Sequence, residues 1–144
     1  MRVTQFRDDR TIRALFWMIA AFSLLVTSVY AGDLAEIRQR GVLRHLGIPY
    51  AHFVRDTAKG LDGLDVELMQ LFSAHLGVEY QWVQTSWSEV FGDLTGQRVQ
   101  PTKNNGVEVI GKTAVRGDII ANGLTILEWR MQVVQFSNPT FPTG

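Results

Sequence analysis

The residues best suited to chemistry in this chain are Gly123, Thr125 and Arg130, near its C-terminal end. They follow a short apolar stretch, Asp118–Ala121, that is typical of a buried strand. A turn of this composition can offer free backbone N–H groups at Gly123 and Thr125, the Thr125 hydroxyl and the guanidinium of Arg130. These donors suit a carboxylate, because arginine binds two oxygens side by side and glycine lets a ligand approach the backbone closely. The alternative is a strand–turn–helix in which Arg130 is a solvated surface charge.

Alternating helices and strands are expected to position these donors. The sequence predicts a helix at Asp33–Arg40, a strand at Val42–Ile48, a helix from Asp65 to about Leu76, a strand at Val78–Val83 and a helix at about Ser88–Leu94. Asp65 is expected to cap the N-terminus of its helix. This alternation implies an α/β fold, with a parallel or mixed sheet flanked by helices and ligands bound beyond the carboxyl ends of the strands.

The first 31 residues are typical of a secretory signal peptide. Four arginines precede an apolar run from Ala14 to about Val26, and Val29-Tyr30-Ala31 places small residues at a cleavage site. This run is shorter than the ~20 residues that cross a bilayer. We expect cleavage after residue 31, a periplasmic location and no stable membrane insertion afterwards. An uncleaved N-terminal anchor is the alternative.

Composition argues against several functions for residues 32–144. Ten basic and twelve acidic residues remain there and form no basic block, so no nucleic-acid partner is expected. The chain has no cysteine, which excludes disulfides, a thiol nucleophile and thiolate metal sites. The histidines lack metal-binding spacing and no catalytic motif is present, so we predict no metal, no cofactor and no enzymatic activity. Arg116-Gly117-Asp118 spells a cell-adhesion tripeptide, but a turn into a buried strand is the better interpretation.

The C-terminal region resembles the family 3 periplasmic solute-binding proteins, the amino-acid receptors of bacterial ABC importers. Eight residues match the signature of that family in order and spacing: Asp118, Gly123, Thr125, Arg130, Val134, Phe136, Ser137 and Pro139. The resemblance implies that Arg130 and the Gly123–Thr125 turn hold the α-carboxylate of an amino acid. It also implies delivery of this ligand to the membrane permease of an ABC importer.

The resemblance extends upstream and covers nearly all of the chain after residue 32. Asp33–Leu43 is similar to the opening helix and strand of the family, and Gly63–Leu68 is similar to the start of its next helix. Tyr50 and Trp87 fall where the family has aromatic residues that flank the ligand side chain. The alternative is that both are core aromatics.

Three departures from the family pattern alter the expected site. Gly47 stands where many members have an aspartate that binds the α-ammonium, and Leu127 stands where threonine is usual. Residues 97–115 form an insertion, in which Asn104-Asn105-Gly106 predicts the turn of a β-hairpin or flap.

The resemblance covers only the N-terminal lobe, lobe 1, of a two-lobed fold, type II in this class. We therefore predict an incomplete lobe at 32–144 that binds its carboxylate ligand weakly, in about the millimolar range. It would be a fragment of a longer receptor, a truncated product or a lobe completed by a partner chain. Other functions are a sensory or regulatory module of a sensor kinase or lytic transglycosylase and, less favoured, a cyclohexadienyl dehydratase-like enzyme.

Overall fold

The computed structural model describes residues 33–140. The predicted signal peptide, residues 1–31, lies outside the described residues. Within residues 33–140, no helix is both long enough and apolar enough to cross a membrane.

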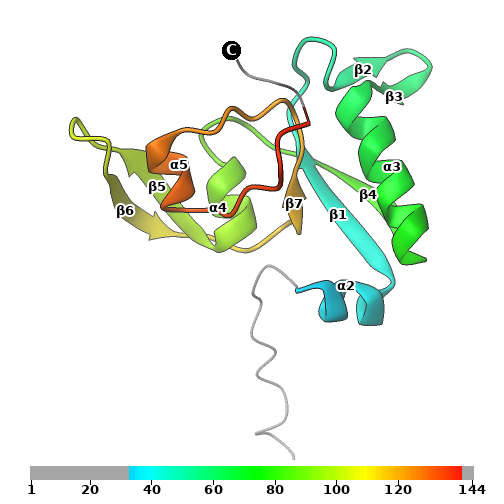
Figure 1. Ribbon diagram of the computed structural model, residues 1–144, viewed down its shortest axis with the longest axis horizontal. Helices are drawn as coiled ribbons and strands as arrows, with labels where there is room; N and C mark the ends of the chain where they lie inside the picture. The colour runs from blue at the N-terminus through cyan, green and yellow to red at the C-terminus, as the bar shows by residue number, and fades with distance from the viewer. Residues whose placement is uncertain (1–32, 141–144) are drawn as a thin grey trace, which may run out of the picture.

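A three-stranded parallel sheet forms the centre of the molecule (Figure 1). Its strands are β1 (Val42–Gly47), β4 (Glu79–Gln84) and β7 (Ile119–Ile120), in the order β4-β1-β7. β1 is central and largely buried, although Arg44 and His45 interrupt its apolar sequence. Both pairings are parallel, so the carboxyl ends of the three strands share one edge of the sheet.

Helices flank this sheet on both sides, which confirms the predicted fold class. Figure 1 shows α3 (Leu64–Leu76) on one side and α4 (Val90–Thr95) with α5 (Glu128–Met131) on the other, while α2 (Leu34–Arg40) precedes β1. One core cluster lies on the α4 side: Leu46, Ile48, Val90 and Phe91, with Trp129 among the partly buried residues packed against it.

Two antiparallel hairpins complete the architecture. The first pairs β2 (Arg55–Thr57) with β3 (Gly60–Asp62), and the second pairs β5 (Gln97–Pro101) with β6 (Val107–Lys112). The second confirms the hairpin predicted within residues 97–115, and Figure 1 shows it projecting away from the central sheet.

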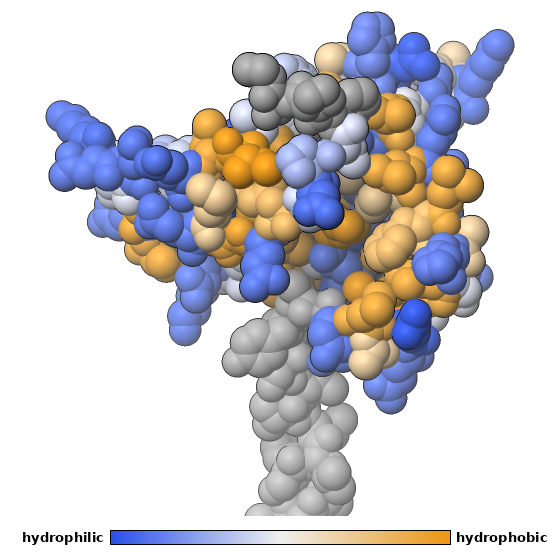
Figure 2. All heavy atoms as spheres, viewed as in Figure 1, coloured by the Kyte–Doolittle hydropathy of each residue, from blue (hydrophilic) through white to orange (hydrophobic). Residues whose placement is uncertain are grey.

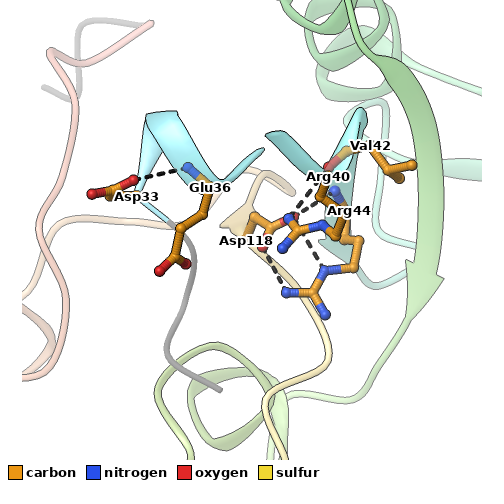
Figure 3. Close-up of polar contacts among 6 residues, drawn as sticks. All are labelled: Asp33, Glu36, Arg40, Val42, Arg44 and Asp118. Carbon is orange, nitrogen blue, oxygen red and sulfur yellow. Dashed lines mark hydrogen bonds and ion pairs between the residues drawn. The ribbon is translucent and has the colours of Figure 1, made fainter. Parts of the chain in front are cut away.

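An ion cluster around Asp118 joins the elements at the amino end of the sheet (Figure 3). The Asp118 side chain is 0% exposed and accepts hydrogen bonds from Arg40 at 2.6 Å and from the backbone and guanidinium of Arg44 at 2.7–3.2 Å. Burial by itself raises the pKa of Asp118, but the bonds and charges of Arg44 and Arg40 outweigh it and leave that pKa lowered. A buried, fully engaged carboxylate cannot present a cell-adhesion tripeptide, so the interpretation as a turn into a strand is confirmed.

Candidate functional site

The five residues predicted to bind a ligand lie together at the edge where the parallel strands end. Tyr50 follows β1, Trp87 follows β4, Gly123 and Thr125 follow β7, and Arg130 belongs to α5. All five line one open hollow of about 280 Å³. That they contact a ligand is a prediction.

Two aromatic side chains form one wall of this hollow. Tyr50 stacks on Phe53 with ring centroids 6.2 Å apart, and it meets the Trp87 ring edge-on at 5.6 Å. Tyr50 is 49% exposed and Trp87 is 45% exposed, so the alternative that they are core residues is wrong. Rings fixed in this way offer an apolar surface to a flat ligand group.

The guanidinium of Arg130 is the one charged group in the lining of the hollow. It donates to the Thr125 carbonyl at 2.8 Å, and it lies 5.3 Å from the Trp129 ring and 6.0 Å from the Phe91 ring. Its Nε atom is buried and has no hydrogen-bond partner among the described residues. Burial lowers the pKa of Arg130. These contacts contradict the alternative of a solvated surface charge and leave a partly dehydrated cation beside the hollow.

The turn after β7 differs from its prediction in one respect. The Gly123 N–H is not free, because it donates to the carboxylate of Asp65 at 2.6 Å. Asp65 therefore does not cap its helix: α3 begins at Leu64, and its N-cap residue Gly63 makes no side-chain cap bond. Within the described part of the chain, the N–H and hydroxyl of Thr125 have no partner, so these two donors remain available to a ligand.

Asp65 was missed as a residue that shapes the site. It is 6% exposed, and burial raises its pKa while the bond from the Gly123 N–H opposes that shift. Gly123 itself has φ +68°, and an added Cβ would lie 2.5 Å from the Phe53 ring. Only glycine fits this position without strain. The local sequence could not predict this contact, since 58 residues separate Asp65 from Gly123.

Buried His45 supports the same turn from the sheet. Its Nε2 lies 2.6 Å from the Ala121 carbonyl and its Nδ1 lies 2.9 Å from the Tyr80 hydroxyl, and the side chain is fully buried. A neutral ring with Nε2–H donating to Ala121 and Nδ1 accepting from Tyr80 satisfies both contacts. Burial lowers the pKa of His45, and the bond to Ala121 opposes this shift only in part. Burial also raises the pKa of Tyr80 to about 12.

A side chain larger than that of glycine at the end of β1 would have to displace the Trp82 ring. A Cβ added at Gly47 would lie 2.3 and 2.4 Å from two carbon atoms of the Trp82 ring. That ring also packs edge-on against His45, with centroids 5.0 Å apart. In this structure the Trp82 ring therefore occupies the place of the aspartate side chain that the resemblance expects.

The hairpin within residues 97–115 contacts the helix that carries Arg130. Asn105, at its tip, donates to Glu128 at 3.2 Å and accepts from Gln132 at 2.9 Å through its carbonyl. The N-cap residue of this helix is Leu127, which makes no side-chain cap bond, whereas threonine would supply one. The hairpin tip thus holds a short helix that has no side-chain cap of its own.

A second, more apolar cavity of about 310 Å³ adjoins the hollow, between β7, α3 and residues 134–140. Asn122 lines it, is fully buried, and has no hydrogen-bond partner for either polar side-chain atom within residues 33–140. Asp65 also lines this cavity and does not line the hollow. Over the same residues, no group of three potential ligands gathers as a metal site would require.

No protein-family model matches the sequence, and no curated protein matches it significantly. Solved structures do match. An ancestral cyclohexadienyl dehydratase is 25% identical with a TM-score of 0.59, over 76% of this chain and 39% of that protein. An ancestral cationic amino acid solute binding protein is 27% identical with a TM-score of 0.58, over 75% of this chain and 40% of that protein.

A mutant of domain 1 of ArgBP from T. maritima, in its arginine-bound form, is 30% identical with a TM-score of 0.56. The match covers 78% of this chain and 74% of that domain. These likenesses show that the chain has part of a periplasmic-binding-protein lobe, with type II solute-binding proteins as its structural neighbours. The chain spans about two fifths of the first two proteins.

Proposed function

We propose that the chain is a solute-binding lobe that recognises a small ligand through its carboxylate, as an amino acid would be recognised, and serves ABC-type uptake in the periplasm. The observation that carries the proposal is Arg130. Its guanidinium is partly dehydrated, and no carboxylate of the described residues lies within ion-pair distance of it. A ligand carboxylate would supply the missing negative charge and the missing acceptors.

The neighbours support this class of ligand. One solved structure is an arginine-bound form of an isolated domain 1, so a single lobe of this fold can hold an amino acid. Among the described residues, the lining of the hollow contains no histidine, lysine or carboxylate to move a proton, which favours binding over catalysis. Thr125 would add a hydroxyl and an N–H to the donors of Arg130.

The proposal is tested by calorimetric titration of the full chain with amino acids and small carboxylates, for Arg130→Ala and for the matched control Arg38→Ala. Arg38 lies exposed on α2, away from the hollow, so its removal should leave binding unchanged. We expect dissociation constants in about the millimolar range, because few of the contacts are desolvated. Binding that persists in Arg130→Ala, or that is absent from the unaltered chain for every carboxylate, would contradict the proposal.

The periplasmic location and the permease partner need their own test. Expression of the chain with and without residues 1–31, followed by fractionation of the cells, should place only the longer form in the periplasm. Uptake of a bound ligand by vesicles that contain the cognate permease should depend on added chain and fail with Arg130→Ala. Equal fractionation of both forms would contradict the location, and uptake that does not depend on the chain would contradict the transport role.

A further inference from the structure

The charge around the hollow is one-sided. Among the described residues, its lining consists of the charged Arg130 together with Tyr50, Trp87, Gly123 and Thr125. A ligand carboxylate therefore finds a cation and hydroxyl and N–H donors. A ligand ammonium finds no carboxylate in this lining.

Nearby acids of the described region are engaged elsewhere. The Asp65 carboxylate accepts the Gly123 N–H and lines the adjoining cavity. Asp93 accepts from Thr85 at 2.6 Å and from Arg116 at 3.0 Å, and Glu89 accepts from Ser86 at 2.8 Å. None of the three lines the hollow.

An acidic side chain at the end of β1 would have to displace the Trp82 ring. Gly47 is the last residue of that strand, and the Trp82 ring occupies the place of its Cβ. The ring is held there by its edge-on contact with His45, which is itself fixed by two hydrogen bonds. At this position the Trp82 ring thus takes the place of an acidic side chain.

The aromatic wall favours a flat ligand group. Tyr50 is fixed between Phe53 and Trp87, yet it and Trp87 stay about half exposed to the hollow. Rings that are ordered before binding lose little conformational freedom when a planar group stacks on them.

We propose that the hollow selects a ligand in which a carboxylate is joined to a planar group, either aryl or guanidinium. An α-ammonium on that ligand adds nothing to its affinity. This inference rests on the proposed function and narrows its ligand class. It implies that removal of the α-amino group from a ligand leaves affinity intact or raises it, since dehydration of an unpaired ammonium opposes binding.

The test titrates the full chain with two matched pairs: L-phenylalanine against 3-phenylpropionate, and L-arginine against 5-guanidinopentanoate. Within each pair, we expect the deaminated ligand to bind within about threefold of the amino acid or more tightly. A carboxylate partner would instead favour the amino acid by about tenfold or more. Such a preference in either pair would overturn the inference, while loss of binding in Arg130→Ala would still uphold the proposed function. If none of the four ligands binds the unaltered chain, the inference is overturned, while the proposed function is decided by the wider panel of amino acids and small carboxylates.

The flat-body part is tested with 3-phenylpropionate against propionate in the unaltered chain and in Trp87→Ala. We expect 3-phenylpropionate to bind at least about fivefold more tightly in the unaltered chain, and Trp87→Ala to remove most of that advantage while propionate changes little. Circular dichroism checks that the variant folds, and Leu71→Ala, on the exposed face of α3, is the matched control. The preference for a planar group is overturned if 3-phenylpropionate still binds more tightly than propionate in Trp87→Ala. It is also overturned if the two ligands bind equally in the unaltered chain.

Discussion

His45 links three segments whose ends form the hollow. It sits on β1, receives the Tyr80 hydroxyl of β4, and reaches the Ala121 carbonyl just before the turn that carries Gly123. Tyr80 is the titratable side chain that contacts it, and no carboxylate of the described residues is bonded to it. A proton added to this ring would therefore be a buried charge without a counterion.

This arrangement makes stability depend on pH near neutrality. Because the folded-state pKa of His45 lies below its ordinary value of about 6.5, the unfolded chain binds the proton first. The stabilisation is present above pH ~6.5 and is lost as the pH falls from there through the folded-state pKa. We expect the free energy of unfolding to fall from pH 7.5 to 5.5, as measured by urea denaturation.

His45→Gln separates this effect from other titrations. Glutamine keeps an amide donor and acceptor but cannot titrate, so the variant should be less stable at pH 7.5 and show a flatter pH profile. The raised pKa of Asp65 contributes to both proteins alike and cancels in the comparison. Equal slopes in the two proteins would show that His45 does not control the pH dependence.

At the scale of elements, the Asp118 cluster holds α2, β1 and β7 together. Asp118→Asn removes the charge and part of the acceptor capacity while Arg40 and Arg44 remain (Figure 3). We expect a loss of about 3 kcal/mol in unfolding free energy, because breaking a buried ion pair leaves a charge uncompensated. The expected loss lies at the low end of the range for broken buried ion pairs, because the side chains of Arg40 and Arg44 are 35% and 19% exposed.

The hairpin β2–β3 offers a matched control. Arg55 and Asp62 form an ion pair of the same 2.6 Å length as that of Arg40 and Asp118, but both of its side chains are more than 40% exposed. Asp62→Asn should therefore cost at most about 1 kcal/mol. Similar losses in the two variants, measured by urea denaturation, would contradict the role assigned to burial.

The elements were largely predictable because their signals are local. Gly41 and Gly77 end α2 and α3 with φ of 74° and 71°, and strands β1 and β4 lie within about one residue of their predicted bounds. The gathering of the five site residues also follows from local pattern, since loops after parallel strands meet at one edge.

What could not be predicted depends on register and packing. The bond between Asp65 and Gly123, the burial of His45 and the Trp82 ring over Gly47 all join residues that are distant in sequence. Asp65 was assigned to a cap because a carboxylate near a helix start usually has that role, and only the pairing of β1 with β7 brings Gly123 within its reach.

At the scale of the whole molecule, one face of α3 carries apolar side chains that stay exposed among the described residues. Leu64, Leu68 and Leu71 are spaced for one side of the helix and are 41%, 37% and 70% exposed. Figure 2 shows hydrophobic surface gathered over this side of the molecule. The chain also has a formal net charge of zero at pH 7, so little repulsion keeps copies apart.

We therefore expect the chain to self-associate as its concentration rises, through this face of α3. Leu71→Lys should reduce the association, because it adds charge at the most exposed leucine and removes no buried contact. Its free energy of unfolding in dilute solution should stay within about 0.5 kcal/mol of that of the unaltered protein, as is usual for surface substitutions. Light scattering coupled to gel filtration measures the mass, with Val109→Lys on the exposed strand β6 as the matched control. If Val109→Lys lowers the mass as much as Leu71→Lys does, the added charge and not the α3 face is responsible for the reduced association. If the unaltered protein has the mass of a monomer at every concentration, the exposed leucines alone do not drive association.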